Sequence, residues 1–334
     1  MQEEVAGNSG ATVLLARIQS LIGQELEQVE RVFEAELDSP LPFVHEVLTH
    51  LAGYRGKRLR PMLLLLSAQA CGGILPQHRV LAAVIEMIHT ATLVHDDVLD
   101  DATTRRHVTT INARWSNETS VLLGDYLFTH AFHLTSSLGD AEACRWIGRA
   151  TNVVCAGELQ QIAERGNLDL SEEQYFDIIE SKTAELCAIS CALGARFTDV
   201  PPATSEALDR FGRSLGIAFQ IADDLLDVVG TEAVAGKSLG SDLQKQKLTL
   251  PLIYLMGQAT AAEREDIRGL LRTPDAGTRA ALAPFLARHG AIEYARSRAM
   301  AYSVAACQSL SCLPDTPAKR FLEALAEFVP DRTA

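Results

Sequence analysis

Apolar residues recur at spacings of three and four along almost the entire chain, and this pattern limits the fold more than any other feature. In residues 14–37 they would form one continuous stripe on a helix, which is typical of an amphipathic helix with one buried face. Strand-like alternation is scarce. Similar helical patterns cover residues 41–53, 60–71, 78–101, 117–138, 141–164, 172–196, 204–229, 247–257, 261–271, 277–288, 291–311 and 317–328. The sequence therefore predicts an all-α protein.

Turn-forming residues separate these segments, but no low-complexity linker divides the chain. The pair Gly72-Gly73 breaks the pattern between two predicted helices, and residues 169–173 open a later helix with a suitable cap and an acidic first turn. Residues 1–11 lack the apolar pattern, so we expect a flexible tail there. A single domain is expected over residues 12–334, with its most apolar helices in the interior of a bundle.

The acidic balance of the chain argues against nucleic acid as a partner. The formal net charge is −13 and the pI is about 5.2, while apolar residues make up 47% of the chain, which is enough for a large core. A protein without a broad basic face cannot offset the negative charge of the phosphates in a nucleic-acid backbone. Positive charge nevertheless gathers in two short segments, residues 55–60 and 105–106. A phosphorylated ligand would therefore have to be bound locally.

Cysteine usage and the N-terminal sequence predict a reducing, cytoplasmic location. The seven cysteines contain no C-x-x-C pair and no zinc-like spacing with histidine, so core packing is expected for all of them. The first residues lack the basic and apolar segments that a secretory signal requires. No apolar run is long enough to span a bilayer, although peripheral contact with a membrane stays open.

Two copies of the pattern D-D-x-x-D lie far apart in the sequence, and each follows an apolar helical segment. Their members are Asp96, Asp97 and Asp100 in the first cluster and Asp223, Asp224 and Asp227 in the second. Positions i and i+4 of a helix share a face, so the outer aspartates of each cluster are predicted to point the same way. One cluster alone would more often be a solvated helix end. Two clusters favour Mg²⁺, which suits paired carboxylates that leave positions for substrate phosphates.

The ordered motifs resemble those of the trans-isoprenyl diphosphate synthase family, also called polyprenyl synthetases. The segments that carry the resemblance are residues 56–61, 86–100, 105–106, 124–125, 182–183, 219–227 and 236–237. The resemblance covers about residues 45–328, and the chain resembles the long-chain, octaprenyl-type members of the family most. It implies an isoprenoid-synthase helical bundle around a central cavity, and a homodimer.

The resemblance also assigns roles to individual residues. The aspartates of both clusters and Lys182 would take part in catalysis, with about three Mg²⁺ ions bound by Asp96, Asp100 and Asp223. The residues expected to hold an allylic diphosphate are Arg105, Lys182, Thr183, Gln220 and Lys237. Those expected to hold isopentenyl diphosphate are Lys57, Arg60, His89 and Arg106. Without the resemblance, His89 would be interpreted as a core histidine. The position of Lys247 stays open between the site and solvent.

The implied reaction is the Mg²⁺-dependent, head-to-tail (1′-4) condensation of isopentenyl diphosphate with an allylic diphosphate. Product length would be set by side chains upstream of Asp96, where Ala91 and Thr92 are small and Ile88 lies deeper. Small residues would let the growing tail pass, which favours a long all-trans product of the octaprenyl type for quinone side chains. Peripheral membrane contact would then help product release.

Three alternatives stay open. A short-chain synthase that makes farnesyl or geranylgeranyl diphosphate is disfavoured by the small residues at positions 91 and 92. A non-catalytic synthase subunit would have lost part of the motif set, which this chain retains. A terpene cyclase would not need the second diphosphate site at Lys57 and Arg60. The chain also departs from the family pattern at Arg55 and His107, where glycine is common.

Overall fold

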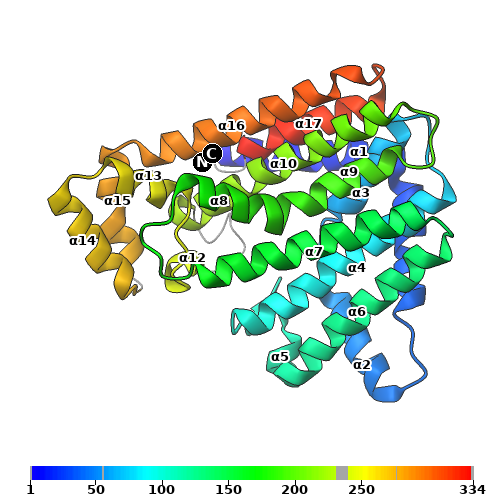
Figure 1. Cartoon of the computed structure of the whole chain (residues 1–334), viewed down its shortest axis with the longest axis horizontal. Coiled ribbons are helices and arrows are strands. Elements are labelled where there is room, and N and C mark those ends of the chain that lie inside the picture. Colours follow the sequence, from blue (N-terminus) through cyan, green and yellow to red (C-terminus); the bar gives the residue numbers. More distant parts are fainter. Residues whose placement is uncertain (1, 55, 231–239, 276, 332–334) are drawn as a thin grey trace.

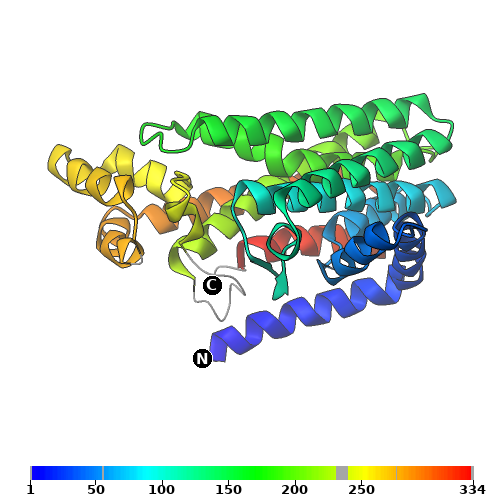
Figure 2. The same cartoon turned by 90° about the horizontal axis from the view of Figure 1, so that it is seen from below.

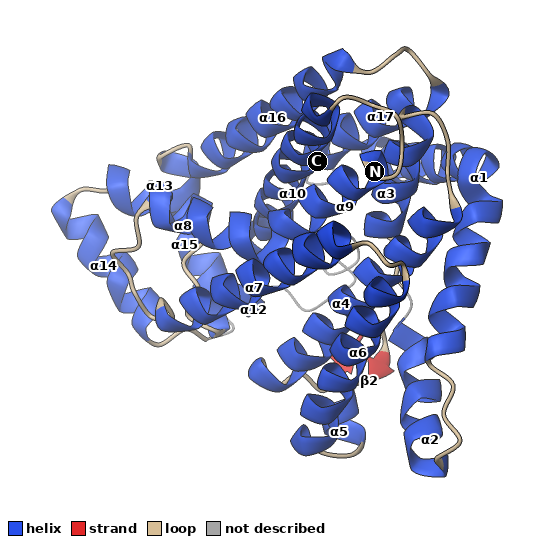
Figure 3. Ribbon diagram, turned by 45° about the vertical axis from the view of Figure 1, so that its right-hand side comes forward, coloured by secondary structure: helices blue, strands red, loops and turns tan. Residues whose placement is uncertain are grey.

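The computed structural model describes residues 2–54, 56–230, 240–275 and 277–331. Helices make up most of this part, and its strands form one two-stranded hairpin, which is red in Figure 3. The all-α class predicted from the apolar spacing is therefore confirmed. Arg55 and Lys237 lie outside the described residues, so the structure does not place them.

The elements follow the predicted order, with several short additions. The longer helices are α1 (Gln2–Glu36), α3 (Leu59–Ala70), α4 (Pro76–Leu99), α6 (Asn117–Ser137), α7 (Ala141–Ala163), α9 (Glu185–Ala195), α10 (Pro202–Val229), α14 (Ala261–Arg272), α15 (Thr278–Arg288), α16 (Ala291–Ser309) and α17 (Pro317–Asp331). The shorter elements are α2 (Pro42–Leu51), η1 (Ala52–Tyr54), β1 (Thr104–Arg105), β2 (Val108–Thr109), α5 (Ile111–Arg114), α8 (Glu172–Ile179), the π-helix η2 (Glu180–Ala184), α12 (Ser241–Gln244), α13 (Leu250–Gln258) and η3 (Leu310–Cys312).

Long helices run side by side through the molecule (Figure 1). The helix α10 packs against α9 and α16, α4 packs against α6, and α3 packs against α9. The helix α1 lies along one side of this bundle (Figure 2), whereas α14 and α15 lie at one end (Figure 1). Residues 63–66 of α3 and 81–85 of α4 are completely buried. The most apolar helices therefore lie in the interior, as the sequence predicts.

A π-helix interrupts the segment 172–196, for which the sequence predicts one continuous helix. This π-helix, η2, is held between glycines of its two neighbours. A Cβ added at Gly157 of α7 would lie 2.7 Å from the backbone nitrogen of Lys182, and one added at Gly216 of α10 would lie 2.5 Å from Cα of Ala184. Glycine thus lets both helices touch the widened backbone. Such π-turns often occur at functional sites, and η2 carries Lys182.

Helix ends show both agreement and difference. The hydroxyl of Ser171 accepts a hydrogen bond from the N–H of Gln174 and caps α8, as predicted. The first helix, in contrast, begins at Gln2, so the backbone of residues 2–11 continues a helix where a flexible tail was expected. Extending an existing helix adds one backbone hydrogen bond per residue, which does not require an apolar stripe. The short helix α5 was not predicted, since four residues are too few to show a period.

The cysteines only partly follow the prediction of core packing. Cys71, Cys187 and Cys191 are buried, but Cys155 and Cys312 are exposed, so the prediction is wrong for these two. A cysteine is small enough to be tolerated on either face of a helix, and spacing alone does not fix which face it takes. In the described part of the chain, no helix is long and apolar enough to cross a membrane.

Candidate active site

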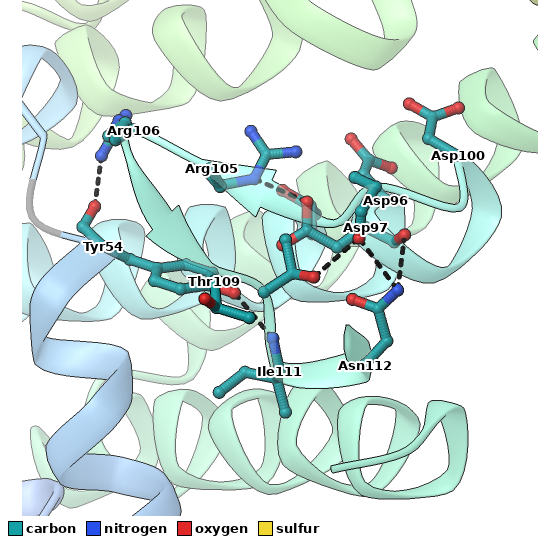
Figure 4. Close-up of polar contacts among 12 residues, drawn as sticks. Tyr54, Asp96, Asp97, Asp100, Arg105, Arg106, Thr109, Ile111 and Asn112 are labelled. Atoms are coloured by element: carbon teal, nitrogen blue, oxygen red, sulfur yellow. Dashed lines mark hydrogen bonds and ion pairs between the residues drawn. The ribbon is translucent and has the colours of Figure 1, made fainter. Parts of the chain in front are cut away.

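The first aspartate cluster lies at the C-terminal end of α4. Figure 4 shows the carboxylates of Asp96 and Asp100 on one side of the helix, as their spacing predicts. Asp97 is almost completely buried and accepts a 2.8 Å hydrogen bond from Nε of Arg105. The side chain of Asn112 donates to the backbone carbonyl of Asp97. Asp96 and Asp100 are therefore the members of this cluster that face the site.

Lys182 of the π-helix lies opposite Asp96. Its Nζ is 4.0 Å from a carboxylate oxygen of Asp96 and donates a 2.8 Å hydrogen bond to Gln161 of α7. It also forms an ion pair with Glu158. Burial raises the pKa of Asp96 to about 6, although the charge of Lys182 opposes this shift. Since Lys182 is shared with Glu158, the negative charge of Asp96 is not fully compensated, and a further cation beside it would be stabilised.

Three cations surround Asp100. Nζ of Lys245 lies 2.8 Å from Oδ2 of Asp100, while Nη2 of Arg165 and Nζ of Lys247 lie 3.4 Å and 3.7 Å from Oδ1. Burial acts to raise the pKa of Asp100, but the hydrogen bond from Lys245 and the charge of Lys247 hold it below its usual value. Lys247, whose position the sequence left open, therefore reaches the site.

The second aspartate cluster lies near the C-terminal end of α10. Asp224 is buried and is held at both carboxylate oxygens, by the hydroxyl of Tyr175 at 2.6 Å and by the side-chain amide of Gln220 at 2.7 Å. Asp227 is also buried, and it accepts a 3.1 Å hydrogen bond from the N–H of Asp242. Asp223, in contrast, is partly exposed. A partly exposed carboxylate can reach a metal ion, so Asp223 stays the predicted metal ligand of the second cluster.

A cavity of about 100 Å³ lies beside the second cluster. The predicted site residues along its wall are Lys182, Thr183, Gln220 and Asp224, and Lys247 also lines it. The hydroxyl of Thr183 donates a 2.9 Å hydrogen bond to Gln220, which links the π-helix to α10. The structure therefore brings three residues predicted for the allylic diphosphate together with one of the aspartate clusters.

A basic cluster surrounds His89 of α4. Burial lowers the pKa of His89 well below its usual value, and the charges of Arg60, Arg106 and Arg105 lower it further. His89 is therefore neutral among guanidinium groups. Nε of Arg60 is buried without a hydrogen-bond partner. A diphosphate would relieve the mutual repulsion of these cations and provide acceptors for their donors.

The hairpin between α4 and α5 positions Arg105 and Arg106. Arg106 and His107 form its two-residue turn with φ values of 51° and 66°. Such turns need positive φ at both central residues, which accounts for the common glycine at position 107 in the family pattern. Arg106 donates to the backbone carbonyl of Tyr54. A Cβ added at Gly56 would meet the Arg106 guanidinium, so Gly56, which precedes the exposed Lys57, leaves room for this side chain.

Arg58 has a different role from the basic residues beside it in sequence. Its guanidinium forms ion pairs with Glu30 of α1 and Glu86 of α4, and Nη1 lies 2.6 Å from Glu86. The same group lies 5.2 Å from the centre of the Phe33 ring. Arg58 therefore joins helices, whereas Arg60 faces the basic cluster.

The donor set of the first cluster fits Mg²⁺ bound together with a diphosphate. Among the residues that the structure describes, no three His, Cys, Asp or Glu side chains form a metal-binding group by themselves. Asp96 and Asp100 nevertheless offer hard oxygen ligands on one face, and the pKa of Asp96, raised by burial to about 6, reflects uncompensated negative charge. Mg²⁺ commonly takes one or two carboxylates and fills its other positions with water and substrate phosphates.

The residues predicted to control product length lie on α4. Ala91 and Ile88 are completely buried. Ala91 belongs to an apolar cluster with Leu48 of α2 and Leu127 of α6, whereas Ile88 belongs to the main core. Thr92 is partly buried, and its hydroxyl donates a 2.7 Å hydrogen bond to the backbone carbonyl of His89.

Several partners of the site residues were not found from the sequence. They are Glu158, Gln161, Arg165, Tyr175, Asp242 and Lys245. Arg165 and Lys245 lie in loops, where no helical period indicates the direction of a side chain. The one local signal was the pair of lysines at 245 and 247 directly before an apolar helix.

Comparisons with known proteins agree with this geometry. A family model described as polyprenyl synthetase matches residues 41–284. The octaprenyl diphosphate synthase of Escherichia coli (strain K12) is 36% identical over 321 residues, which cover 95% of this chain and 99% of that protein. A solved decaprenyl diphosphate synthase from Rhodobacter capsulatus has a TM-score of 0.91 and 36% identity, and the match covers 96% of this chain and 99% of that one.

A second solved structure bears on the metal. A polyprenyl synthase from Caulobacter crescentus CB15, complexed with calcium and isoprenyl diphosphate, has a TM-score of 0.90 and 33% identity, and the match covers 96% of this chain and 98% of that one. The family is metal-dependent and consists of prenyltransferases with the isoprenoid-synthase helical fold. The coverage is nearly complete, and the motifs that predicted the resemblance lie within it. The chain therefore belongs to the polyprenyl synthetase family.

Proposed function

We propose that this prenyltransferase condenses isopentenyl diphosphate with an allylic diphosphate, head to tail (1′-4), to make a long-chain all-trans polyprenyl diphosphate of the octaprenyl type for quinone side chains. The observation that carries the proposal is the presence of two candidate diphosphate sites on one helix, α4, one that would act through metal ions and one that is basic. One is the acidic face of Asp96 and Asp100, and the other is the basic cluster around His89. A reaction between two diphosphates needs two such sites.

The acidic site would activate the allylic substrate. Asp96, Asp100 and Asp223 would hold about three Mg²⁺ ions, which neutralise the charge that develops on the leaving pyrophosphate. Lys182 adds a positive charge from the opposite wall of the site, 4.0 Å from Asp96. Thr183, with Gln220, Arg105 and Lys237, would bind the same diphosphate. The allylic C–O bond then breaks, and its electron pair leaves with the pyrophosphate.

The basic site would hold and orient isopentenyl diphosphate. Arg60 and Arg106 would bind its diphosphate together with Lys57, and the neutral His89 would add a hydrogen bond without adding charge. The double bond of this substrate attacks the allylic cation, a carbon–carbon bond forms, and one proton is lost. The departing pyrophosphate is the proposed proton acceptor. Catalysis by a side-chain triad is therefore not required.

Product length is the most specific part of the proposal. The relatives named above include an octaprenyl and a decaprenyl diphosphate synthase. Ala91 and Thr92, the small residues one turn upstream of Asp96, support a tunnel that passes a long chain. The test is incubation of the purified protein with farnesyl diphosphate, labelled isopentenyl diphosphate and Mg²⁺, followed by chromatography of the products. Failure to elongate farnesyl diphosphate, or products that end at geranylgeranyl length, would contradict the proposal.

A pair of variants tests the tunnel. Ala91→Phe is expected to shorten the products while isopentenyl diphosphate is still consumed, because the ring would block the tail. Leu75→Phe adds an aromatic ring at the exposed start of the same helix, where Leu75 is 38% exposed, and is expected to leave product length unchanged. Unchanged product length in Ala91→Phe would refute the tunnel assignment.

The proposal also includes a cytoplasmic homodimer that touches the membrane peripherally for product release. Helices α6 and α7 carry exposed apolar side chains, with Leu122 and Leu159 both 68% exposed, and a second copy of the chain would cover them. Sedimentation of the wild type and of Leu122→Glu tests whether the chain forms this dimer.

The alternative functions have their own tests. Turnover by the purified chain alone would exclude a non-catalytic subunit, and consumption of isopentenyl diphosphate would exclude a terpene cyclase.

A further inference from the structure

Two of the three cations around Asp100 come from loops that the sequence motifs did not single out. Arg165 follows α7, and Lys245 follows α12. Nη2 of Arg165 lies 3.4 Å from Oδ1 of Asp100, and Nζ of Lys245 lies 2.8 Å from Oδ2. Each carboxylate oxygen of one predicted metal ligand therefore already has a cation of the protein beside it.

The backbone fixes this arrangement. The N–H of Gly166 donates a 2.9 Å hydrogen bond to the carbonyl of Gln246, which joins the two loops. Gln246 has a φ of 53° and Gly166 a φ of 77°, so both are in the left-handed region at the junction. Such a conformation is unfavourable for glutamine and is often found where function requires it. Arg165 and Lys245, each next to this junction in sequence, are thereby directed at the same carboxylate.

The two outer aspartates of the first cluster differ as a result. Asp96 has one cation at 4.0 Å, and that cation also pairs with Glu158. Asp100 has three cations within 4 Å. A divalent ion that binds between the two carboxylates would compete with Arg165 and Lys245 for the oxygens of Asp100. It would also be repelled by both cations unless a polyanion arrived with it.

We propose that Arg165 and Lys245 couple the binding of Mg²⁺ to the binding of the diphosphate. By pairing with Asp100 they weaken Mg²⁺ binding to the protein alone, and a diphosphate, which offers both side chains new acceptor oxygens, makes Asp100 available to the metal. They are positioning residues, since they act through Asp100. The inference rests on the proposed function, in which Asp100 is a metal ligand for a diphosphate substrate.

The test measures binding and does not depend on product formation. Calorimetric titrations would give the affinity for Mg²⁺ with and without inorganic pyrophosphate, in the wild type and in the double variant Arg165→Gln/Lys245→Gln. We expect the double variant to bind Mg²⁺ alone about tenfold more tightly and Mg²⁺-pyrophosphate about tenfold more weakly, because coupling between two ligands is reciprocal. The factor by which pyrophosphate strengthens Mg²⁺ binding should fall accordingly.

Matched variants separate this role from simple stabilisation. Arg165→Lys/Lys245→Arg keeps both charges and should keep most of the coupling. Arg320→Gln removes another ion pair, between the 66%-exposed Arg320 and Asp315, and should leave metal binding unchanged. If the double glutamine variant had wild-type affinities and only a lower melting temperature, the two cations would be ordinary ion pairs and the inference would be refuted. If the wild type itself showed no linkage between Mg²⁺ and pyrophosphate, the proposed function would fail first.

Discussion

Replacing Arg58 with methionine should destabilise the protein severely, although Arg58 stands among residues predicted to bind substrate. Arg58 is only 14% exposed in its side chain, and its partner Glu86 is 7% exposed. Removing one member of a buried ion pair typically costs about 3–5 kcal/mol, because the other charge stays buried without compensation. The lost contact with the Phe33 ring adds about 0.5–1 kcal/mol. The expected loss in the free energy of unfolding is therefore about 5 kcal/mol.

The pH dependence of that loss identifies its cause. Burial raises the pKa of Glu86, and Arg58 acts to lower it. A carboxyl group whose pKa is raised in the folded state binds its proton more tightly there, so stability falls as pH rises from the unfolded pKa through the folded pKa. Without Arg58 the folded pKa of Glu86 rises further. The loss in Arg58→Met should therefore be larger at about pH 8 than at about pH 5.

Urea denaturation at both pH values, monitored by circular dichroism, measures the effect. Adding Glu86→Gln to Arg58→Met should recover part of the stability, since a buried neutral amide costs less than a buried charge. Arg60→Met is the matched control. Its Nε has no hydrogen-bond partner, so it should lose less than about 1.5 kcal/mol but raise KM for isopentenyl diphosphate. A loss below about 1 kcal/mol in Arg58→Met, equal at both pH values, would refute the reasoning.

Three further predictions concern the site. Gly157→Ala places a Cβ 2.7 Å from the backbone nitrogen of Lys182, so it should cost about 1–3 kcal/mol of stability and raise KM for the allylic substrate. Gly148→Ala on the same helix, where an added Cβ has nothing within 4 Å, should be neutral or slightly stabilising. Equal melting temperatures and KM values in the two variants would contradict this prediction. Since burial raises the pKa of Asp96 to about 6, protonation of Asp96 should weaken Mg²⁺-pyrophosphate binding as the pH falls below that value. If calorimetry gave the same affinity at about pH 7 and about pH 5, the role of Asp96 as a metal ligand would be refuted. Chelation of Mg²⁺ should abolish product formation and renewed Mg²⁺ should restore it, and turnover that persists with the chelator would exclude metal-assisted ionisation.

Helical periodicity predicted most of the fold because nearly every helix here buries one apolar face. It could not show the π-helix, since one inserted residue shifts the apolar stripe by only about a quarter of a turn. The glycines that leave room for the π-helix, Gly157 and Gly216, lie outside the segment. A single-segment pattern contains no information about such contacts. The placement of Lys182 and Thr183 was therefore supplied by the resemblance and not by periodicity.

Side-chain direction within the first aspartate cluster followed from helix geometry, but the charges around it did not. The i, i+4 rule placed Asp96 and Asp100 on one face, as Figure 4 shows. The cations that meet Asp100 come from two loops joined by one backbone hydrogen bond, and neither loop has a period. Prediction thus worked where direction depends on local geometry and failed where it depends on chain segments that meet only in the folded state.

The middle aspartate of each D-D-x-x-D cluster has a role other than the metal binding proposed for the outer positions. Asp97 is turned from the shared face and accepts from Arg105, and Asp224 accepts from Tyr175 and Gln220. Each middle residue therefore fixes a side chain that is itself expected to bind the allylic diphosphate. An aspartate at this position holds Arg105 or Gln220 in place before substrate arrives, so less conformational entropy is lost on binding. In the proposed function, the repeated motif would thus combine metal ligands with an internal support for the groups expected to bind the same diphosphate.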